Sequence, residues 1–460
     1  NTFRRLFAEG TFNAAFVPSY TSELLLSKKK AQKFANSVFN LLVLILLSLT
    51  ILIEIFMPKF IDIIAPGFSD INEKYNLAIN LTRITFPFLF FISLASFLSA
   101  ILNSHNKFAA AAAAPLILNI ILILCFLFIN KIDAELVYYL SYAISLAGII
   151  QFLFLIIFTK KFFLPKINFS LNIDKKIKIF FNKLLPSIFA SGVTQINILI
   201  GTIIASFQAS AVSYLYYADR IYQINLAIAG IVIGTIILPN LSRHVKANNK
   251  LKLDDLQNKS LVLSLFLSLP ATFALIIASE EIVSALFGYG SFDQNSVKNS
   301  ALALFYFALG LPAFSLIKIF SSFVFARNDT KTPFYFSLIS VIINIMISIS
   351  FFSKLGFVII PIATTISSWV NGILLFVLVI NKNYFSFNKI FVSQISKILV
   401  INFFCLGIFF LLINYFSSYF LFNNNYKFFA LILLVLFIFT LYLLFSILIK
   451  AFKISDIKLK

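Results

Sequence analysis

Long apolar runs separated by short polar connections make up most of the sequence. A bilayer core of about 30 Å is crossed by a helix of about 20 apolar residues. A shorter apolar stretch at 11–26 is typical of the end of one further span. The pattern therefore predicts an all-α polytopic membrane protein. Runs of full length predict twelve membrane-spanning helices, at 36–57, 79–102, 109–130, 135–159, 185–207, 211–238, 260–287, 297–325, 333–353, 356–381, 393–416 and 427–449.

The composition agrees with this class. Hydrophobic residues make up 60% of the 460 residues and charged residues 12%, against about 45–50% and about 25% in an ordinary soluble domain. A soluble core cannot bury that much apolar surface, so a cytosolic globular enzyme is excluded. Cys125 and Cys405 each lie inside an apolar run and form no spaced pair. This argues against a disulfide framework and against a cysteine zinc site.

The net charge is +20, which in a soluble protein would favour nucleic-acid binding. Here the basic residues gather in alternate connections, so the positive-inside rule explains them and no nucleic-acid partner is expected. The opposite connections hold scattered basic residues such as Lys59 and Lys427, together with Asp62, Asp70 and Asp293. We predict that the basic side, with the C-terminal tail, is cytoplasmic. The basic clusters are Lys28–Lys33, Lys160–Lys183, Arg243–Lys259, Arg327–Lys331, Lys382–Lys389 and Lys450–Lys460.

Turn residues recur at a nearly constant offset, which indicates an internal repeat. An even number of spans separates the copies, so both copies have the same orientation in the membrane, as in parallel-repeat transporters. Chance alignment of common loop residues is the alternative. The pairs are Pro18 with Pro239 and Gly67 with Gly288 at an offset of 221, Pro87 with Pro312 at 225, and Pro115 with Pro333 at 218.

The repeat predicts three parts: an N-terminal lobe at 1–165, a C-terminal lobe at 183–381, and two extra helices with a cytoplasmic tail at 390–460. The sequence opens at Asn1, without an initiator methionine or a signal peptide. We therefore expect the chain to be N-terminally truncated and its first lobe to be incomplete.

A charged side chain inside a bilayer costs about 2.5–3.5 kcal/mol on insertion scales, so each one requires an explanation. Arg220 lies in the sixth complete span, about 13 Å from the end of that span at about 1.5 Å per residue. Its neighbour Asp219 does not face it, because adjacent helical residues point in different directions. Arg220 is therefore a candidate binding residue, with an internal ion pair as the alternative. Arg83 and Lys318 are weaker candidates, because each could instead reach the membrane surface or pair locally.

A second group of charges lies near the N-terminus. Arg5 and Glu9 are four residues apart and would pair on a helix surface. Arg4 is left without a local partner, and we predict that it faces a cavity between the lobes, opposite Arg220. Two guanidiniums at one cavity make a site for an anion, because arginine binds phosphate oxygens through two parallel hydrogen bonds.

No metal or catalytic motif accompanies these charges. Walker A, HExxH and GxSxG patterns are absent from the sequence, and His105 and His244 fall in short polar connections. We predict no metal site, no cofactor and no catalytic residue. Gln195, Asn197 and Asn344 lie inside spans without a neighbouring carboxylate. They are predicted to link helices, with an ion site as the alternative.

Several sequence blocks are more specific. The most specific are Arg4–Phe12, followed by Ala-Phe-Val-Pro at 15–18, and Tyr-Tyr-Ala-Asp-Arg at Tyr216–Arg220. Further blocks are Ala65–Phe68, Ile84–Pro87, Ala100–Asn103, Gly234–Pro239 and Lys331–Pro333. In this order, and over nearly the whole chain, the blocks resemble the MurJ/MviN lipid II flippases of the multidrug/oligosaccharidyl-lipid/polysaccharide exporter superfamily. The last two spans match this family only in hydropathy.

The resemblance implies two lobes of six helices plus two extra helices, with one whole span and part of the next missing here. It implies a flippase that moves undecaprenyl-pyrophosphate-linked disaccharide-pentapeptide to the periplasmic leaflet of the bacterial inner membrane for peptidoglycan synthesis. Arg4, Glu9 and Arg220 match positions that the family uses in its central cavity. The implied partners are lipid II, membrane lipids, and proteins of cell-wall synthesis and division. Some members bind sodium through acidic residues in the second lobe, and the lack of carboxylates beside Asn344 argues against sodium coupling here.

A hydrated diphosphate must cross the apolar core of the bilayer. We therefore predict a cationic, water-accessible cavity, with alternating access by rocking of the lobes. The spans at 393–416 and 427–449 would offer an apolar groove for the prenyl tail. Two other functions stay open. A cation-coupled multidrug or polysaccharide exporter of the same superfamily would more naturally use an intramembrane carboxylate. A membrane transferase acting on lipid-linked sugars would need a carboxylate pair or a metal-binding loop, and the longest connection, 239–259, offers only Asp254 and Asp255.

Overall fold

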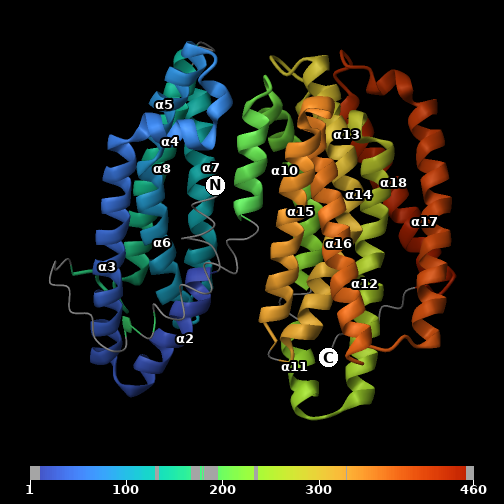
Figure 1. The fold of residues 1–460 in the computed structure, drawn as a ribbon, viewed down its shortest axis with the longest axis horizontal. Coiled ribbons are helices and arrows are strands. Elements are labelled where there is room, and N and C mark those ends of the chain that lie inside the picture. Colours follow the sequence, from blue (N-terminus) through green and yellow to red (C-terminus); the bar gives the residue numbers. More distant parts are fainter. Residues whose placement is uncertain are drawn as a thin grey trace. The chain divides into compact units, whose positions relative to one another are not determined.

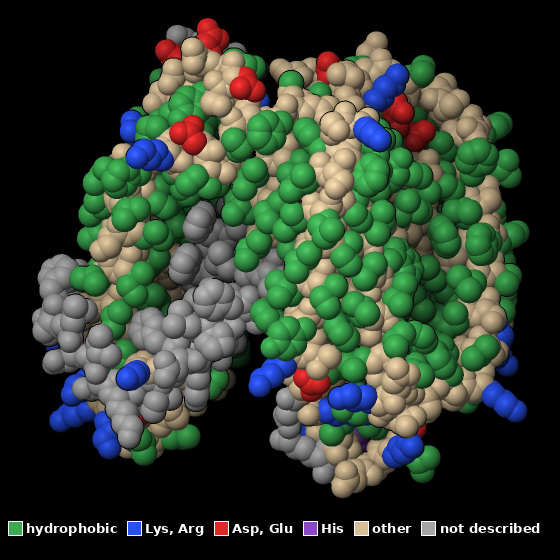
Figure 2. All heavy atoms as spheres, in the orientation of Figure 1, with side chains coloured by type: hydrophobic (Ala, Val, Ile, Leu, Met, Phe, Trp, Pro, Cys, Tyr) green, Lys and Arg blue, Asp and Glu red, His purple; other side chains and the backbone are tan. Residues whose placement is uncertain are grey.

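The computed structural model describes residues 11–129, 134–166, 177–178, 180, 195–232, 237–327 and 329–451. The regular structure in these ranges is helical. The chain divides into two compact units, unit 1 (Asn1–Phe207) and unit 2 (Gln208–Lys460), each built from long helices (Figure 1). On the visible face of unit 2, hydrophobic side chains cover the middle, whereas charged side chains gather at the two ends (Figure 2). This is the surface expected of a membrane-spanning bundle.

Local chemistry sets the helix starts in unit 1. Ser27 caps α3, because its side chain accepts a hydrogen bond from the Lys30 amide. Pro87 opens α6, where its missing N–H would have no helical partner in any case. The ring of Phe16 packs 4.9 Å from that of Phe97, at the centre of an aromatic core. The elements are α2 (Thr11–Leu26), α3 (Lys28–Ile55), α4 (Met57–Ile64), η1 (Pro66–Phe68), α5 (Asn72–Thr85), α6 (Pro87–Ser104), α7 (Phe108–Phe128), α8 (Ala134–Thr159) and a helix at Gln195–Ser206.

The turn at Ala65–Phe68 packs against the end of the helix at Gln195–Ser206 within unit 1. The Gly67 amide donates a 3.0 Å hydrogen bond to Ser206 Oγ. A Cβ atom at position 67 would lie 2.3 Å from the Ser206 carbonyl oxygen. Only glycine permits this close approach of two backbones, which gives a packing reason for the glycine of this sequence block.

Capping side chains also set helix starts in unit 2. Asn249, Asp293 and Asn388 each accept a hydrogen bond from a backbone amide in the first turn of the helix that follows. The elements are α10 (Ala211–Val232), α11 (Leu238–Lys246), α12 (Lys250–Ile277), α13 (Ser279–Phe287), α14 (Gln294–Phe325), α15 (Lys331–Leu355), η3 (Gly356–Val358), α16 (Ile359–Asn381), α17 (Lys389–Tyr415), η4 (Ser417–Phe420) and α18 (Lys427–Leu448).

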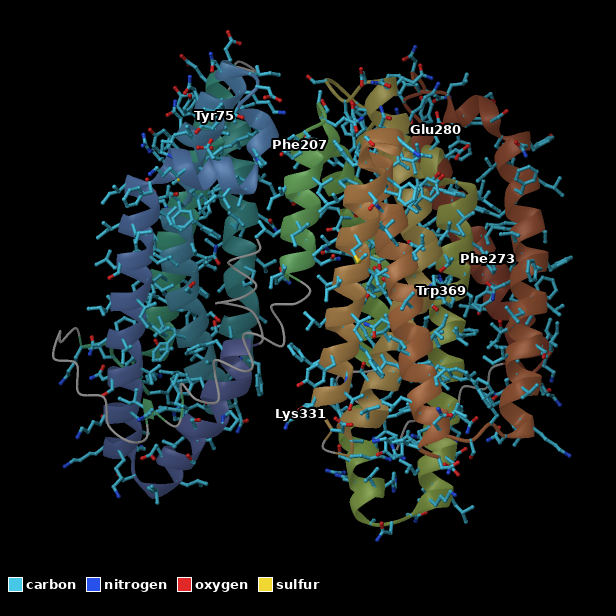
Figure 3. All side chains as sticks on the ribbon, in the orientation of Figure 1. Tyr75, Phe207, Phe273, Glu280, Lys331 and Trp369 are labelled. Atoms are coloured by element: carbon cyan, nitrogen blue, oxygen red, sulfur yellow. The ribbon has the colours of Figure 1, made fainter. Side chains whose placement is uncertain are left out.

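Polar side chains link α16 to its neighbours. Trp369 Nε1 donates a 3.0 Å hydrogen bond to the Leu309 carbonyl of α14, and Figure 3 labels this tryptophan on α16. Asn344 of α15 is buried, and its Nδ2 donates a 3.0 Å hydrogen bond to Thr364 Oγ1. The predicted role of Asn344 as a link between helices is confirmed.

Nine helical segments among the described residues are long and apolar enough to span a membrane. Nine of the twelve predicted spans fall in these segments to within two residues, because the segment Lys331–Asn381 contains both 333–353 and 356–381, separated by η3. A tenth, 260–287, falls in its segment only as far as Ile277. The predicted span 211–238 corresponds to α10, which is described as far as Val232. The predicted span 185–207 is described only from residue 195.

The predicted ends were wrong in three places. The run 260–287 is not one span, because α12 ends at Ile277 and α13 begins at Ser279. The connection 239–259 is mostly helical, because α11 and the start of α12 fill it, and Lys28–Lys33 belongs to α3. An apolar run marks the part of a helix that lies in the bilayer. Capping residues decide where the helix begins, and lysines in the extended part remain solvated.

Candidate functional site

Helix α10 has two different faces. Ala218 and Tyr222 are buried, and the Tyr222 ring packs against aromatic rings of α14. Tyr216, Arg220 and Ile224 recur every four residues and therefore share another face. On that face Tyr216 is 49% exposed and Ile224 is 62% exposed. Arg220 thus lies on the more exposed face of α10.

The contacts of Arg220 leave its hydrogen-bonding capacity unused. Its guanidinium carbon lies 4.5 Å from the centre of the Tyr216 ring, which holds the cation by its charge. The Nε atom is buried and has no hydrogen-bond partner, and no ion pair of Arg220 occurs among the described residues. Asp219 instead accepts a hydrogen bond from Gln223 Nε2. A guanidinium held against an aromatic ring, with its Nε–H unpaired, can receive an anion.

Lys318 lies close to the same helix. It belongs to α14, and its Nζ donates a 3.3 Å hydrogen bond to the Leu226 carbonyl of α10. Leu226 is six residues beyond Arg220, or about 9 Å along the axis at about 1.5 Å per residue. The structure therefore brings Lys318 and Arg220 to one helix pair, α10 and α14, and one donor of Lys318 is engaged by the backbone.

Arg83 belongs to unit 1, where it is exposed near the end of α5. Its charge acts on Glu54, at the end of α3. The Oε1 atom of Glu54 is buried and has no hydrogen-bond partner. Sequence reasoning missed Glu54, although a single acidic residue within the apolar run 42–56 is a signal that could have identified it.

Arg4, Arg5 and Glu9 lie outside the described residues, which begin at residue 11. Their proposed roles stay predictions. Gln195 and Asn197 are described, and each has a buried side-chain oxygen without a hydrogen-bond partner.

His105 and His244 are separate from these charges. Tyr20 Oη lies 3.2 Å from His105 Nε2, and Phe162 stacks on the His105 ring with the two ring centres 4.3 Å apart. Burial, with a smaller contribution from the charge of Lys28, lowers the pKa of His105. Across the part of the chain that the structure describes, no group of three or more His, Cys, Asp or Glu could hold a metal ion.

Two apolar pockets lie along α17 and α18. The first has a volume of about 370 Å³ and lies between α12, α17 and α18, with Asn225 of α10 at its edge. Pro270, Phe273 and Cys405 line it. Figure 3 labels Phe273 on α12, and its ring lies 5.7 Å from that of Phe403 on α17. The second pocket, of about 540 Å³, is lined by the last turns of α17, by η4 and by the first half of α18. Both pockets lie where the sequence predicts an apolar groove.

These features define a polytopic helical membrane protein. An inward-facing multidrug resistance MATE transporter of the MOP superfamily shares the fold, with a TM-score of 0.66, 17% identity, and coverage of 83% of this chain and 87% of that one. Residues 1–452 match the protein family described as Lipid II flippase MurJ. The chain belongs to this family.

Relatives and a solved structure agree with this assignment. The chain is 40% identical to a probable lipid II flippase MurJ of Rickettsia prowazekii, over 81% of this chain and 73% of that protein. It is 38% identical to the probable lipid II flippase MurJ of Rhizobium meliloti, over 87% of this chain and 76% of that protein. A structure of lipid II flippase MurJ in an inward closed conformation matches with a TM-score of 0.78 and 27% identity, covering 97% of this chain and 90% of that one. The predicted family and fold are confirmed, and the chain is a transporter rather than a transferase.

Proposed function

We propose that this chain moves lipid II, the undecaprenyl-pyrophosphate-linked disaccharide-pentapeptide, from the cytoplasmic to the periplasmic leaflet of the bacterial inner membrane. Its family membership and the relatives at 40% and 38% identity support flipping of lipid II. The observation that carries the proposal in this structure is Arg220, a guanidinium with an unpaired buried N–H on α10, the helix that corresponds to the predicted span 211–238.

The diphosphate is the part of the substrate that membrane transfer disfavours most, because it loses hydration. Arg220 replaces that hydration with charge-assisted hydrogen bonds from a planar fork. Lys318 adds a second cation on the neighbouring helix. The rest of the proposed set is Arg83, Arg4 and Arg5, with Glu9 orienting Arg5.

The prenyl tail has different requirements. Each buried CH₂ group contributes about 0.8 kcal/mol on transfer from water. In a bilayer, however, the tail is already in an apolar solvent, so a tail pocket contributes mainly by shape. The pocket of about 370 Å³ between α12, α17 and α18 would take the first isoprenyl units, while the rest of the tail stays in lipid.

The proposed orientation places the basic ends of the helices and the C-terminal tail in the cytoplasm. Rocking of the two lobes then alternates access, and proteins of cell-wall synthesis and division receive the product. A cytoplasm-negative membrane potential would draw the empty cationic site inward, by about 2.3 kcal/mol per charge per 100 mV.

The orientation has a direct test. Single cysteines at Ser69 and at Asn249, in a cysteine-free background, are treated in whole cells with a membrane-impermeant thiol reagent. We expect labelling at position 69 and protection at 249. The reverse pattern would contradict the orientation.

The function is tested with labelled lipid II in proteoliposomes. Arg220→Lys keeps the charge but removes the planar fork, so we expect normal abundance and poor flipping, whereas Arg220→Ala should fail to flip. Arg243→Ala, which removes an exposed arginine on α11, is the matched control and should flip normally. If membrane abundance and melting temperature fall in parallel with flipping, Arg220 supports the fold rather than the substrate.

A further inference from the structure

Buried polar contacts attach α17 and α18 to the rest of unit 2 at three levels. The two helices lie at the edge of unit 2 in Figure 1, at the red end of the colour range. One level lies at the start of α18, one at the connection that leads into α17, and one between α12 and the middle of α18.

Lys427 makes the first attachment. It is 1% exposed, and its Nζ donates hydrogen bonds of 2.6 Å to the Gly288 carbonyl and 2.7 Å to the Phe422 carbonyl. The Tyr289 ring centre lies 4.3 Å from the same nitrogen. Within the described ranges, Lys427 has no ion-pair partner. Gly288 follows the last turn of α13, where the carbonyl ends carry partial negative charge.

Gly288 provides the space for this ammonium group. A Cβ atom at position 288 would lie 3.2 Å from Lys427 Nζ and 2.7 Å from the Ser284 carbonyl oxygen. A larger residue would therefore displace the lysine or the end of α13. The buried cation and the glycine form one unit that joins α18 to α13.

Arg327 makes the second attachment, at the other end of the helices. Its two terminal nitrogens donate hydrogen bonds of 2.7 Å to the Phe323 carbonyl and 3.0 Å to the Tyr384 carbonyl. Gln257 of α12 donates to the same Tyr384 carbonyl over 2.9 Å, and Asn258 donates to the Ser386 carbonyl over 3.0 Å. The connection between α16 and α17 is thereby bonded to both α12 and α14.

Tyr442 makes the third attachment, at the wall of the apolar pocket. Pro270 has no N–H and therefore cannot donate a helical hydrogen bond to the Phe266 carbonyl four residues earlier. Tyr442 Oη of α18 donates a 2.8 Å hydrogen bond to that carbonyl. Both Pro270 and Tyr442 line the first pocket. The walls of the pocket are therefore bonded to each other.

From these contacts we infer that Lys427 and Arg327 are positioning residues, which hold α17 and α18 at a fixed spacing from α12. The apolar pocket keeps its shape and moves with unit 2 during transport. The entry of a prenyl tail into this pocket rests on the proposed function. The shape of the pocket can be measured without transport.

Cys405 is a native reporter of that shape, because it is buried and lines the pocket. Cys125→Ser leaves it as the single cysteine. Alkylation of Cys405 by N-ethylmaleimide is followed by mass spectrometry in phosphatidylethanolamine–phosphatidylglycerol vesicles, with and without geranylgeranyl phosphate. We expect Lys427→Met to raise the alkylation rate by about fivefold or more, because the pocket opens locally, and to abolish protection by the prenyl phosphate. Lys389→Met, which removes an exposed lysine at the start of α17, is the matched control and should change neither.

Measurements of lipid II flipping distinguish a positioning role of Lys427 from a role in folding. In Lys427→Met we expect flipping of lipid II with its full tail to fall by about tenfold, whereas an analogue with a three-isoprene tail should flip as in the parent. Arg327→Gln is measured in the same way, which keeps the test valid if Lys427→Met does not accumulate. Unchanged alkylation and protection in both variants would overturn the inference. If the parent protein protects Cys405 but moves no lipid II, the proposed function fails and the positioning role stands.

Discussion

Arg220 and Lys427 are both cations of unit 2 without an ion pair among the described residues, yet they use their donors in opposite ways. Lys427 is almost fully buried, and two backbone carbonyls accept its hydrogen bonds. Arg220 rests on the face of Tyr216, and its Nε has no partner. Both have an aromatic neighbour, so the two cations differ in their burial and in their carbonyl acceptors.

This difference separates structural from binding roles. Satisfied donors offset the cost of burying a cation, and removing the cation leaves carbonyls without partners. A cation with unsatisfied donors leaves the folded state at a higher energy than it would have with a partner. A ligand that supplies the missing acceptors can recover that energy, so unused hydrogen-bonding capacity indicates the binding residue more directly than charge does.

The same substitution at both positions tests the comparison. Arg220→Met should lower lipid II flipping by about 100-fold or more, because it removes the charge-assisted hydrogen bonds to the diphosphate. Its melting temperature should not fall, since no protein acceptor loses a donor. Flipping in proteoliposomes and thermal unfolding in detergent are measured on one preparation. A clear fall in melting temperature would remove the contrast with Lys427.

Lys427→Met should have the opposite profile. Loss of two hydrogen bonds from a charged donor should lower the free energy of unfolding by about 2–4 kcal/mol, because the buried Gly288 carbonyl and the half-buried Phe422 carbonyl lose their donor. Binding of inorganic diphosphate should be unchanged, because the substitution leaves Arg220 intact. Chemical unfolding and calorimetric titration provide the two values. Weakened diphosphate binding at full stability would reverse the assignment.

Asp329 provides a smaller effect at a solvated position. The Thr332 amide and hydroxyl donate to its carboxylate over 3.0 and 2.7 Å, and the backbone hydrogen bond, aided by the hydroxyl and opposed by burial, lowers the pKa of Asp329. Because the folded-state pKa is depressed, this stabilisation is complete above the ordinary value of 3.8 and is lost as the pH falls through the lowered value.

Asp329→Asn should therefore remove part of the acid sensitivity. The loss of stability at neutral pH should stay below about 1 kcal/mol, because the group is only partly buried and salt screens it. Melting temperatures at neutral and acid pH, compared with those of the parent, measure this effect. An unchanged difference between the two pH values would show that the carboxylate does not contribute.

The sequence predicts Arg220 better than Lys427 for a physical reason. Arg220 interrupts an apolar run, and its contact with Tyr216 follows from a spacing of four residues on one helix. In the sequence, Lys427 is one of several scattered basic residues near a connection. Nothing nearby indicates its role, because its partner Gly288 is 139 residues away. Contacts of this range depend on packing, which an apolar pattern does not specify.

The fold likewise has features that follow from the local sequence and features that depend on packing. Helix type and approximate position follow from runs of about 20 apolar residues. The break at Ala278 between α12 and α13 lies inside such a run, so hydropathy does not reveal it. The capping residues Asn249 and Asn388 are visible in the sequence, but many asparagines occur in the connections and only the structure identifies those that cap.

Pro270 has a mechanical consequence for α12. A helix bends more easily at a proline, because one backbone hydrogen bond is missing there. Tyr442 donates a hydrogen bond from another helix to the Phe266 carbonyl, so bending of α12 at this point changes the length or angle of that contact. The stiffness of the two helices is therefore shared, and a force that flexes the last turns of α12 is transmitted directly to the middle of α18.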